Sequence, residues 1–177
     1  MKNILLMKES SELLEKSASL GFKSCMCLGK EIVLVEAESK KELLKEINKA
    51  KGKFTIFKTG SEEMLRFALE KSNVDLVYGM EGINARDSVH FVRGGLDQVT
   101  CKIAAERGKV VGFSFNDILG SGNKGKLLGR IMFNVKLCKK YNVKMMFGNF
   151  STSVSSMRSR KDLEVLFRVL GGRNSSF

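Results

Sequence analysis

The glycine-rich stretch at residues 120–126 has the residue types and spacing of a phosphate-binding loop. Its sequence, Gly-Ser-Gly-Asn-Lys-Gly-Lys, matches the frame GxxxxGK and follows a predicted strand. Leu127 stands where such a loop needs a hydroxyl group for magnesium, and no apolar strand ends in a convincing metal-binding Asp, which disfavours an NTPase. Free backbone N–H groups, two lysines and a helix start still predict an anion site, with a flexible surface loop as the alternative.

A second stretch, residues 151–163, combines hydroxyl groups with cations. Serines and a threonine lead into Arg158, Arg160 and Lys161 at the start of a predicted helix. Hydroxyls, backbone N–H groups and arginines contact phosphates without reading sequence. The stretch therefore predicts phosphate contacts; the alternative is a polar loop in which Ser159 caps the helix.

Residues suited to acid–base or metal chemistry are sparse. His90 is the single histidine, whereas a hydrolytic metal site usually needs several imidazoles or a dense set of carboxylates. In the second half of the chain, Asp87 and Asp117 remain as loop acids once helix-start residues are set aside. We therefore predict no catalytic residue and no bound metal or cofactor in this chain, and His90 is not expected to act as a base.

The positive charge is confined to one half of the chain. Residues 1–85 hold 14 Lys or Arg against 13 Asp or Glu, whereas residues 86–177 hold 17 against 6 and supply nearly all of the formal +12. A basic surplus confined to half of a globular sequence is typical of a polyanion-binding face, most often for nucleic acid. A lysine-rich proteome with no ligand is the alternative, but it predicts a similar excess in the first half.

Length and composition suit one globular domain, which we place at residues 1–172 with a short tail at 173–177. The four cysteines form no CxxC pair, so a disulfide framework and a zinc knuckle are both poorly supported. The first residues are too short an apolar run for a signal peptide, and no run approaches a membrane span. We expect a cytoplasmic protein with free thiols.

Short apolar runs alternate with amphipathic stretches along the whole chain, which predicts βα units and a parallel sheet. Seven strands in 177 residues fit either an open doubly wound sheet or an incomplete barrel. Residues 79–96 and 116–125 are predicted to be long irregular loops of the kind that carries function. The predicted strands are residues 4–7, 24–28, 32–35, 54–58, 74–78, 110–115 and 143–147, and the predicted helices are residues 11–20, 40–50, 62–71, 97–107, 126–141 and 160–170.

The predicted helix at residues 126–141 has two different sides. One is an apolar stripe suited to the core. The opposite side places Phe133, Leu137 and Tyr141 among cations, which is unusual for a solvated face and predicts a protein partner with RNA nearby. A helix buried on both sides is the alternative.

Four segments, in chain order, resemble motifs of the ribonuclease P protein component 3 family. Residues 89–99 (VHFVRGGLDQV) resemble its stretch H-x-R-x-S-G-L-N/D-x-V, with Gly94 where members often have Ser. Residues 111–115 resemble its strand I/V-G-F-S-F. Residues 128–141 resemble its long helix, and residues 157–171 resemble its R-x-P/S-x-D-L…L-G end. The resemblance runs over roughly residues 75–172.

This resemblance implies an α/β fold that is TIM-barrel-like, either closed or incomplete, with about seven parallel strands and outer helices. It implies a barrel related to the polymerase-and-histidinol-phosphatase superfamily, without that superfamily's metal cluster. The implied function is that of a protein subunit of ribonuclease P, which binds and organises the catalytic RNA for cleavage of the 5′ leader of precursor tRNA. By position, the RNA-facing residues would be Arg86, Arg93, Lys102, Lys124, Lys126, Arg130, Arg158, Arg160 and Lys161.

In such a holoenzyme, magnesium belongs to the active site of the RNA, and this chain itself is non-catalytic. The implied partners are ribonuclease P RNA, precursor tRNA and the other protein components, especially component 2, with no membrane. Two other hypotheses stay open: a stand-alone metal-dependent phosphoesterase on a related barrel, and an RNA-binding scaffold of another ribonucleoprotein.

Overall fold

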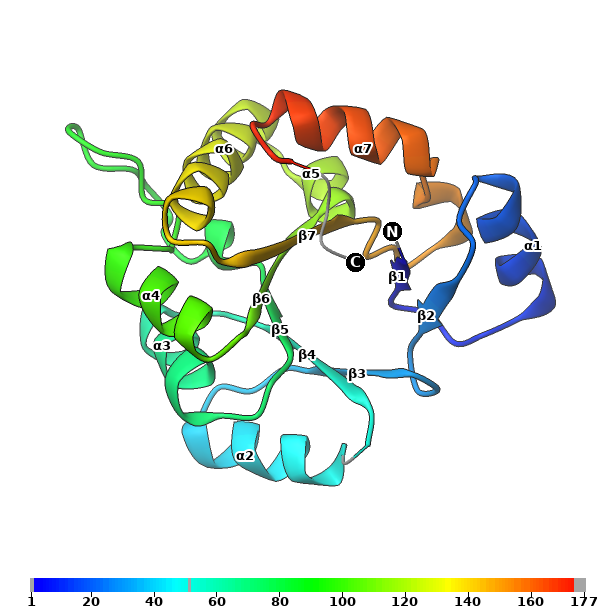
Figure 1. The fold of residues 1–177 in the computed structure, drawn as a ribbon, viewed down its shortest axis with the longest axis horizontal. Coiled ribbons are helices and arrows are strands. Elements are labelled where there is room, and N and C mark those ends of the chain that lie inside the picture. Colours follow the sequence, from blue (N-terminus) through cyan, green and yellow to red (C-terminus); the bar gives the residue numbers. More distant parts are fainter. Residues whose placement is uncertain (1, 51, 174–177) are drawn as a thin grey trace.

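Seven parallel strands follow one another in chain order around a ring in the computed structural model, which describes residues 2–50 and 52–173 (Figure 1). Five of them form one sheet in the order β3-β4-β5-β6-β7, and β1 pairs with β2 in a second sheet. The strands are β1 (Asn3–Leu5), β2 (Cys25–Cys27), β3 (Ile32–Val35), β4 (Phe54–Lys58), β5 (Leu76–Tyr78), β6 (Val110–Ser114) and β7 (Lys144–Gly148).

Two short contacts join the sheets into the ring. Beyond β7, Ser151 bridges Leu5 of β1, and its carbonyl accepts a hydrogen bond of 2.9 Å from the N–H of Leu6. On the other side Leu28 bridges Ile32, and Gly29 donates to the carbonyl of Ile32 at 2.8 Å. The predicted barrel-like α/β fold is confirmed. The ring is held at these two points by isolated bridges and not by continuous ladders.

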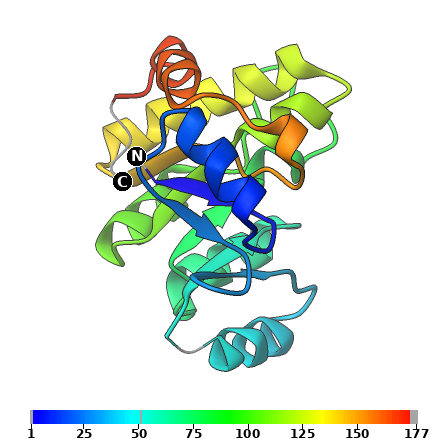
Figure 2. The same cartoon turned by 90° about the vertical axis from the view of Figure 1, so that its right-hand side faces the viewer.

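Helices surround the ring on its outside (Figure 1). Figure 2 shows α1 lying over the β1–β2 pair, with α7 and α2 at opposite ends of the molecule. The helices are α1 (Ser11–Ser19), α2 (Lys40–Lys49), α3 (Glu62–Lys71), α4 (Gln98–Glu106), α5 (Phe115–Gly120), α6 (Lys124–Lys140) and α7 (Arg160–Val169), with 3-10 turns η1 (Met80–Gly82) and η2 (Val154–Ser156). Among the described residues, no helix is long and apolar enough to cross a membrane.

Strand alternation divides the core into an inner and an outer layer, because successive side chains point to opposite faces. Inside the ring lie Ile4, Ile32, Ile56, Leu76, Tyr78, Val110, Met146 and Phe150. Between the strands and the helices, Phe57, Val77 and Phe147 pack against helical residues such as Ile131 and Phe167. A smaller cluster, with Leu5, Leu13 and Cys27, joins β1 and β2 to α1.

Helix starts account for most differences from the predicted elements. Ser114, the last residue of β6, caps α5 by accepting the N–H of Asp117, so a helix occupies residues that were predicted to be irregular. Asn123 accepts the N–H of Lys126 at 3.0 Å and starts α6 two residues earlier than predicted. The remaining strands and helices are confirmed to within about two residues.

Candidate nucleic-acid interface

The connection between β5 and α4 extends away from the barrel past the outer helices (Figure 1). We call residues 83–95 the finger. Two glycines form its base. Gly95 has φ of +89°, and a Cβ atom there would lie 2.2 Å from the carbonyl oxygen of Met80. A Cβ atom on Gly94 would lie 2.4 Å from Oδ1 of Asn134. The chain can therefore return from the finger to α4 along this path only without side chains at these two positions.

Arg130 of α6 fastens the finger to the barrel. Its side chain is only 4% exposed. Nη1 donates to the carbonyls of Glu81 and Asn84, both at 2.7 Å, and Nε donates to Oδ1 of Asp87 at 2.9 Å. Nη2 lies 2.8 Å from the same carboxylate oxygen. The expectation that Arg130 faces RNA is wrong for this structure, because the finger covers its guanidinium.

Asp87 completes this attachment from the finger side. Its Oδ1 also accepts the N–H of Arg93 at 2.9 Å, which closes the finger on itself. This N–H and the Arg130 guanidinium hold the pKa of Asp87 below its usual range, so the carboxylate stays ionised. Asp87, predicted as a loop acid that could perform chemistry, is occupied as an anchor.

A buried amide and a buried carboxyl lie beneath the finger. Asn134 is fully buried and donates to Oε1 of Glu81 at 3.1 Å and to the carbonyl of Gly94 at 2.7 Å. Burial raises the pKa of Glu81 to about 7, only partly offset by hydrogen bonds from its own backbone and from Asn134. Asn134 thus ties the strand-end turn η1 to the base of the finger.

The outer part of the finger exposes apolar and cationic groups together. Val89 is 95% exposed and Phe91 is 59% exposed. The Arg93 guanidinium lies 5.6 Å from the centre of the Phe91 ring, while Arg86 and His90 are exposed nearby in sequence. An exposed ring beside cations can stack on an unpaired base while the cations neutralise phosphates. Phe91 is the part of this arrangement that the sequence prediction missed.

The other predicted RNA-facing cations fall into separate groups. Lys126 donates to the carbonyl of Ala85 in the finger, and Lys124 is exposed on the same helix turn. Lys102 of α4 lies 6.0 Å from the Tyr141 ring. Their role in RNA binding, like that of Arg86 and Arg93, stays a prediction.

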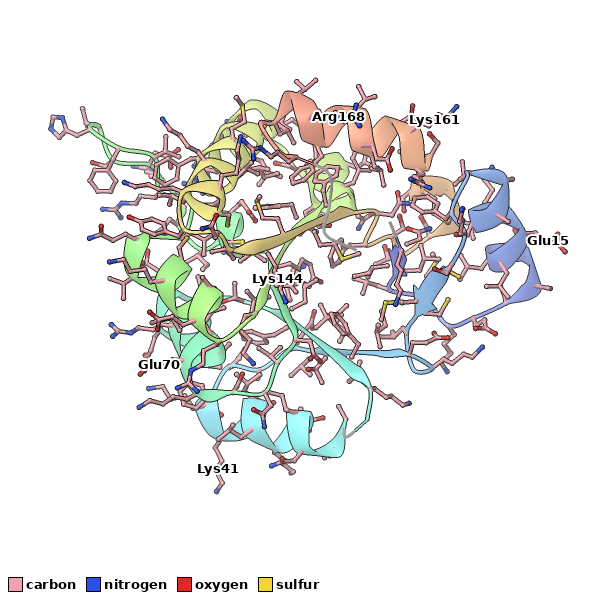
Figure 3. The ribbon with its side chains drawn as sticks, viewed as in Figure 1. Glu15, Lys41, Glu70, Lys144, Lys161 and Arg168 are labelled. Carbon is pink, nitrogen blue, oxygen red and sulfur yellow. The ribbon has the colours of Figure 1, made fainter. Side chains whose placement is uncertain are left out.

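The third group lies where η2 leads into α7. The Arg158 guanidinium lies 5.8 Å from the ring of Phe115, at the start of α5. Arg160 is ion-paired with Glu164 at 2.8 Å, so part of its charge is already neutralised. Lys161 points outward from α7 (Figure 3). The predicted set is therefore distributed over the finger, α4, α6 and the start of α7.

The three predicted partner residues line or border a groove beside the finger. Phe133 and Leu137 are half-buried and line a groove of about 860 Å³ together with Glu62, Arg66 and residues 91–98. Tyr141, also half-buried, donates to Gln98 of this lining at 3.4 Å. The side of α6 opposite its apolar stripe is thus covered at Arg130 and Asn134, and opens into the groove at Phe133 and Leu137.

A smaller cavity of about 270 Å³ opens at the carboxyl ends of β4, β5 and β6. Lys58, Glu81 and Asp117 contribute charged groups to its lining, and burial raises the pKa of Asp117. Sequence reasoning missed Lys58, the last residue of β4, and Glu81, in the turn η1 after β5, although barrels place functional groups at and just beyond these strand ends. His90 lies outside this cavity, on the finger, and its predicted lack of a catalytic role stays a prediction.

The glycine-rich stretch does not form the cradle of a phosphate-binding loop. Gly120 is the last residue of α5 and Lys124 is the first of α6, which leaves three residues between the helices. The Asn123 side chain already accepts one of the N–H groups at the start of α6. The predicted anion site at this helix start stays a prediction.

Comparison with known proteins identifies relatives of the chain. No family model matches the sequence. Ribonuclease P protein component 3 of Methanosarcina acetivorans is 31% identical over 115 residues, which are 63% of this chain and 44% of that protein. The corresponding protein of Archaeoglobus fulgidus is 23% identical over 163 residues, which are 89% of this chain and 76% of that protein. The chain is therefore similar in sequence to ribonuclease P protein component 3 of these archaea.

The solved structures agree with this relationship at the level of the fold. A chain from the cryo-EM structure of an archaeal ribonuclease P with mature tRNA has a TM-score of 0.72 and 19% identity, covering 97% of this chain and 74% of that chain. The chain spans less than half the length of the Methanosarcina component 3 protein that it matches. The family resemblance read from the sequence is confirmed, and the barrel-like fold with it.

Replacing Arg130 with Met should free the finger from the barrel. The substitution removes two hydrogen bonds to carbonyls and the contact with Asp87, and we expect it to lower the free energy of unfolding by about 2–4 kcal/mol. Amide hydrogen exchange should accelerate across residues 82–93, measured by mass spectrometry. Lys136→Met, on an exposed position of the same helix, is the matched control. Unchanged exchange in the finger of the Arg130 variant would contradict this assignment.

Glu81 should make stability depend on pH. Because burial raises its pKa from 4.5 to about 7, the folded protein keeps a proton that the unfolded chain releases between these values. The contribution of Glu81 to the free energy of unfolding is therefore complete below about pH 4.5, and it is lost as the pH rises to about 7. Glu81→Gln keeps the acceptor for Asn134 and should flatten the decline between about pH 4.5 and pH 7. Urea unfolding at several pH values measures the free energy of unfolding of both proteins. The same dependence on pH in both would show that Glu81 does not titrate in this range.

Proposed function

We propose that this chain is a protein subunit of ribonuclease P that binds and organises the catalytic RNA for cleavage of the 5′ leader of precursor tRNA. The observation that carries the proposal is the alignment with component 3 of Archaeoglobus fulgidus, which spans 163 residues and 76% of that protein. In this proposal the endoribonuclease activity belongs to the holoenzyme. This chain contributes groups that bind RNA but no catalytic groups. Magnesium would then act at the active site of the RNA.

The finger and the two basic helix starts support an RNA-binding role. Arg86 and Arg93 accompany an exposed ring on the finger, and Lys161 and Arg158 lie at the start of α7. Cations of this kind neutralise phosphates and so position an RNA without reading its sequence. Ribonuclease P RNA and precursor tRNA are the proposed RNA partners.

The groove beside the finger is the proposed site for another protein component, with component 2 as the expected partner. Its lining combines Phe133 and Leu137 of α6 with Glu62, Glu63 and Arg66 of α3. Apolar groups accompanied by charged ones are typical of a protein interface.

Removing charge from the start of α7 should weaken RNA binding and its salt dependence. In Arg158→Gln with Lys161→Gln, the slope of log affinity against log salt should become shallower by about 1.5, because two phosphates lose their partners. Arg160 is left in place since it already pairs with Glu164. The control is Lys41→Gln with Lys45→Gln in α2, where Lys41 points outward from the other end of the molecule (Figure 3).

Binding of ribonuclease P RNA at several salt concentrations measures the slope for both double variants. Equal slopes would remove Arg158 and Lys161 from the interface. Turnover of a generic phosphodiester by the isolated chain with manganese, without RNA, would instead support the stand-alone phosphoesterase.

Charge in the groove should block the protein partner without unfolding the chain. Phe133 and Leu137 are one helix turn apart and half-buried, and burying both in an interface is worth on the order of 3–5 kcal/mol. Phe133→Glu with Leu137→Glu should therefore abolish pairing with component 2 in a pull-down of purified proteins. Met132→Glu with Lys136→Glu, on an exposed side of α6, is the control. Failure of the groove variant to fold alone, judged by circular dichroism, would assign both residues to the core of this chain.

A further inference from the structure

We infer that Glu9, Cys27 and Glu31 bind a zinc ion that joins the β1–β2 pair to β3, with the neighbouring Cys25 as the fourth ligand. This site lies apart from the finger and its groove, and it does not depend on the proposed function. Sequence reasoning disfavoured zinc because no CxxC pair is present. The structure brings together ligands that such a pattern search does not connect.

The two thiols lie on one side of a strand because they are two residues apart in β2. Their sulfur atoms are 3.9 Å apart. Two sulfurs that are each about 2.3 Å from a tetrahedral zinc ion lie about 3.8 Å from one another. The pair thus already has the separation of two ligands of one zinc ion. The same spacing suits a disulfide poorly, because residues i and i+2 of a strand have Cα atoms about 6.6 Å apart, at the long end of the disulfide range.

Two carboxylates approach the Cys27 sulfur from neighbouring loops, and Cys25 adjoins this group through Cys27. Glu9 follows β1, and Glu31 lies in the turn between β2 and β3. The ligand atoms of Glu9, Cys27 and Glu31 lie within 4.8 Å of one another, the one group of three such ligands found among the described residues. The N–H of Cys27 donates to Oε2 of Glu31 at 3.0 Å and holds that carboxylate beside the Cys27 sulfur.

A lysine ammonium occupies the cation position in this structure. Nζ of Lys30 lies 2.7 and 2.9 Å from the two carboxylate oxygens of Glu9 and 3.8 Å from Oε1 of Glu31. The two carboxylates therefore concentrate negative charge beside the Cys27 sulfur, and Lys30 now balances that charge. Lys30 is largely exposed on a flexible stem and can move aside when zinc binds.

The chemistry of the ligands selects the metal. Sulfur ligands combined with carboxylates favour zinc over magnesium or calcium, which prefer six or more oxygen ligands. Burial and the neighbouring Cys25 raise the pKa of the Cys27 thiol to about 12, so zinc must displace its proton. The bound ion would connect the loop after β1 to the β2–β3 turn, where Leu28 and Ile32 form an isolated bridge.

Cobalt(II) is the spectroscopic probe for this site. The full chain, purified and kept reduced, is titrated with cobalt(II) and then with zinc. We expect one cobalt per chain, with thiolate-to-cobalt charge-transfer absorption and the visible bands of tetrahedral cobalt, both lost when zinc displaces it. Zinc should also raise the melting temperature. A spectrum without thiolate charge transfer would overturn the proposal.

Two substitutions each remove one proposed zinc ligand and are chosen to disturb the fold little. Cys25→Ala alters a half-buried position, and Glu31→Gln keeps an acceptor for the N–H of Cys27. Each should weaken zinc binding at least about tenfold. Lys30→Ala should strengthen it, because the competing ammonium is gone. Cys101→Ala and Glu12→Gln are matched controls, a buried thiol and an exposed carboxylate elsewhere. Equal zinc affinity in the ligand variants and the controls would overturn the site.

Discussion

The buried guanidinium of Arg130 is the interaction on which the arrangement of the candidate interface depends. It joins α6 to the turn after β5 through two carbonyls and to the finger through Asp87. Burying a cation is costly unless it is paired and hydrogen-bonded, and this one has both kinds of partner. Because the same helix carries Lys126 at its start and Phe133 in the groove, one rigid element positions the finger, a basic helix start and the proposed partner site.

The ring of strands supplies the fixed points for this arrangement. Strand ends place Lys58, Glu81 and Asp117 around one cavity, and Asn134 connects Glu81 to the base of the finger. Strand pairing around the ring is weakest on both sides of the β1–β2 pair, where single bridges replace continuous hydrogen-bonded pairing. The proposed zinc ligands lie on one of these sides. A metal there would strengthen the barrel on the side away from the finger (Figure 1).

The local pattern of apolar and polar residues was enough to predict the seven strands and six of the helices. Alternating side chains in strands, apolar stripes on helices and helix caps are each encoded within a few residues. It could not predict α5, because Ser114 ends a strand and caps a helix with no loop between them. It also misplaced Arg130, since the partner Asp87 is 43 residues away in sequence and only the fold brings the two together. The cluster around Cys27 was missed for the same reason: Glu9 reaches it from another loop.

The most direct test of the account is ultraviolet cross-linking of the full chain to the RNA that it binds in cells, followed by sequencing of the RNA and mass spectrometry of the linked peptides. The account predicts that ribonuclease P RNA is recovered, with cross-links in residues 86–93 of the finger and residues 158–161 at the start of α7. It predicts none in α2, whose exposed lysines belong to the nearly neutral half of the chain. Recovery of a different RNA, or cross-links concentrated on α2, would contradict it.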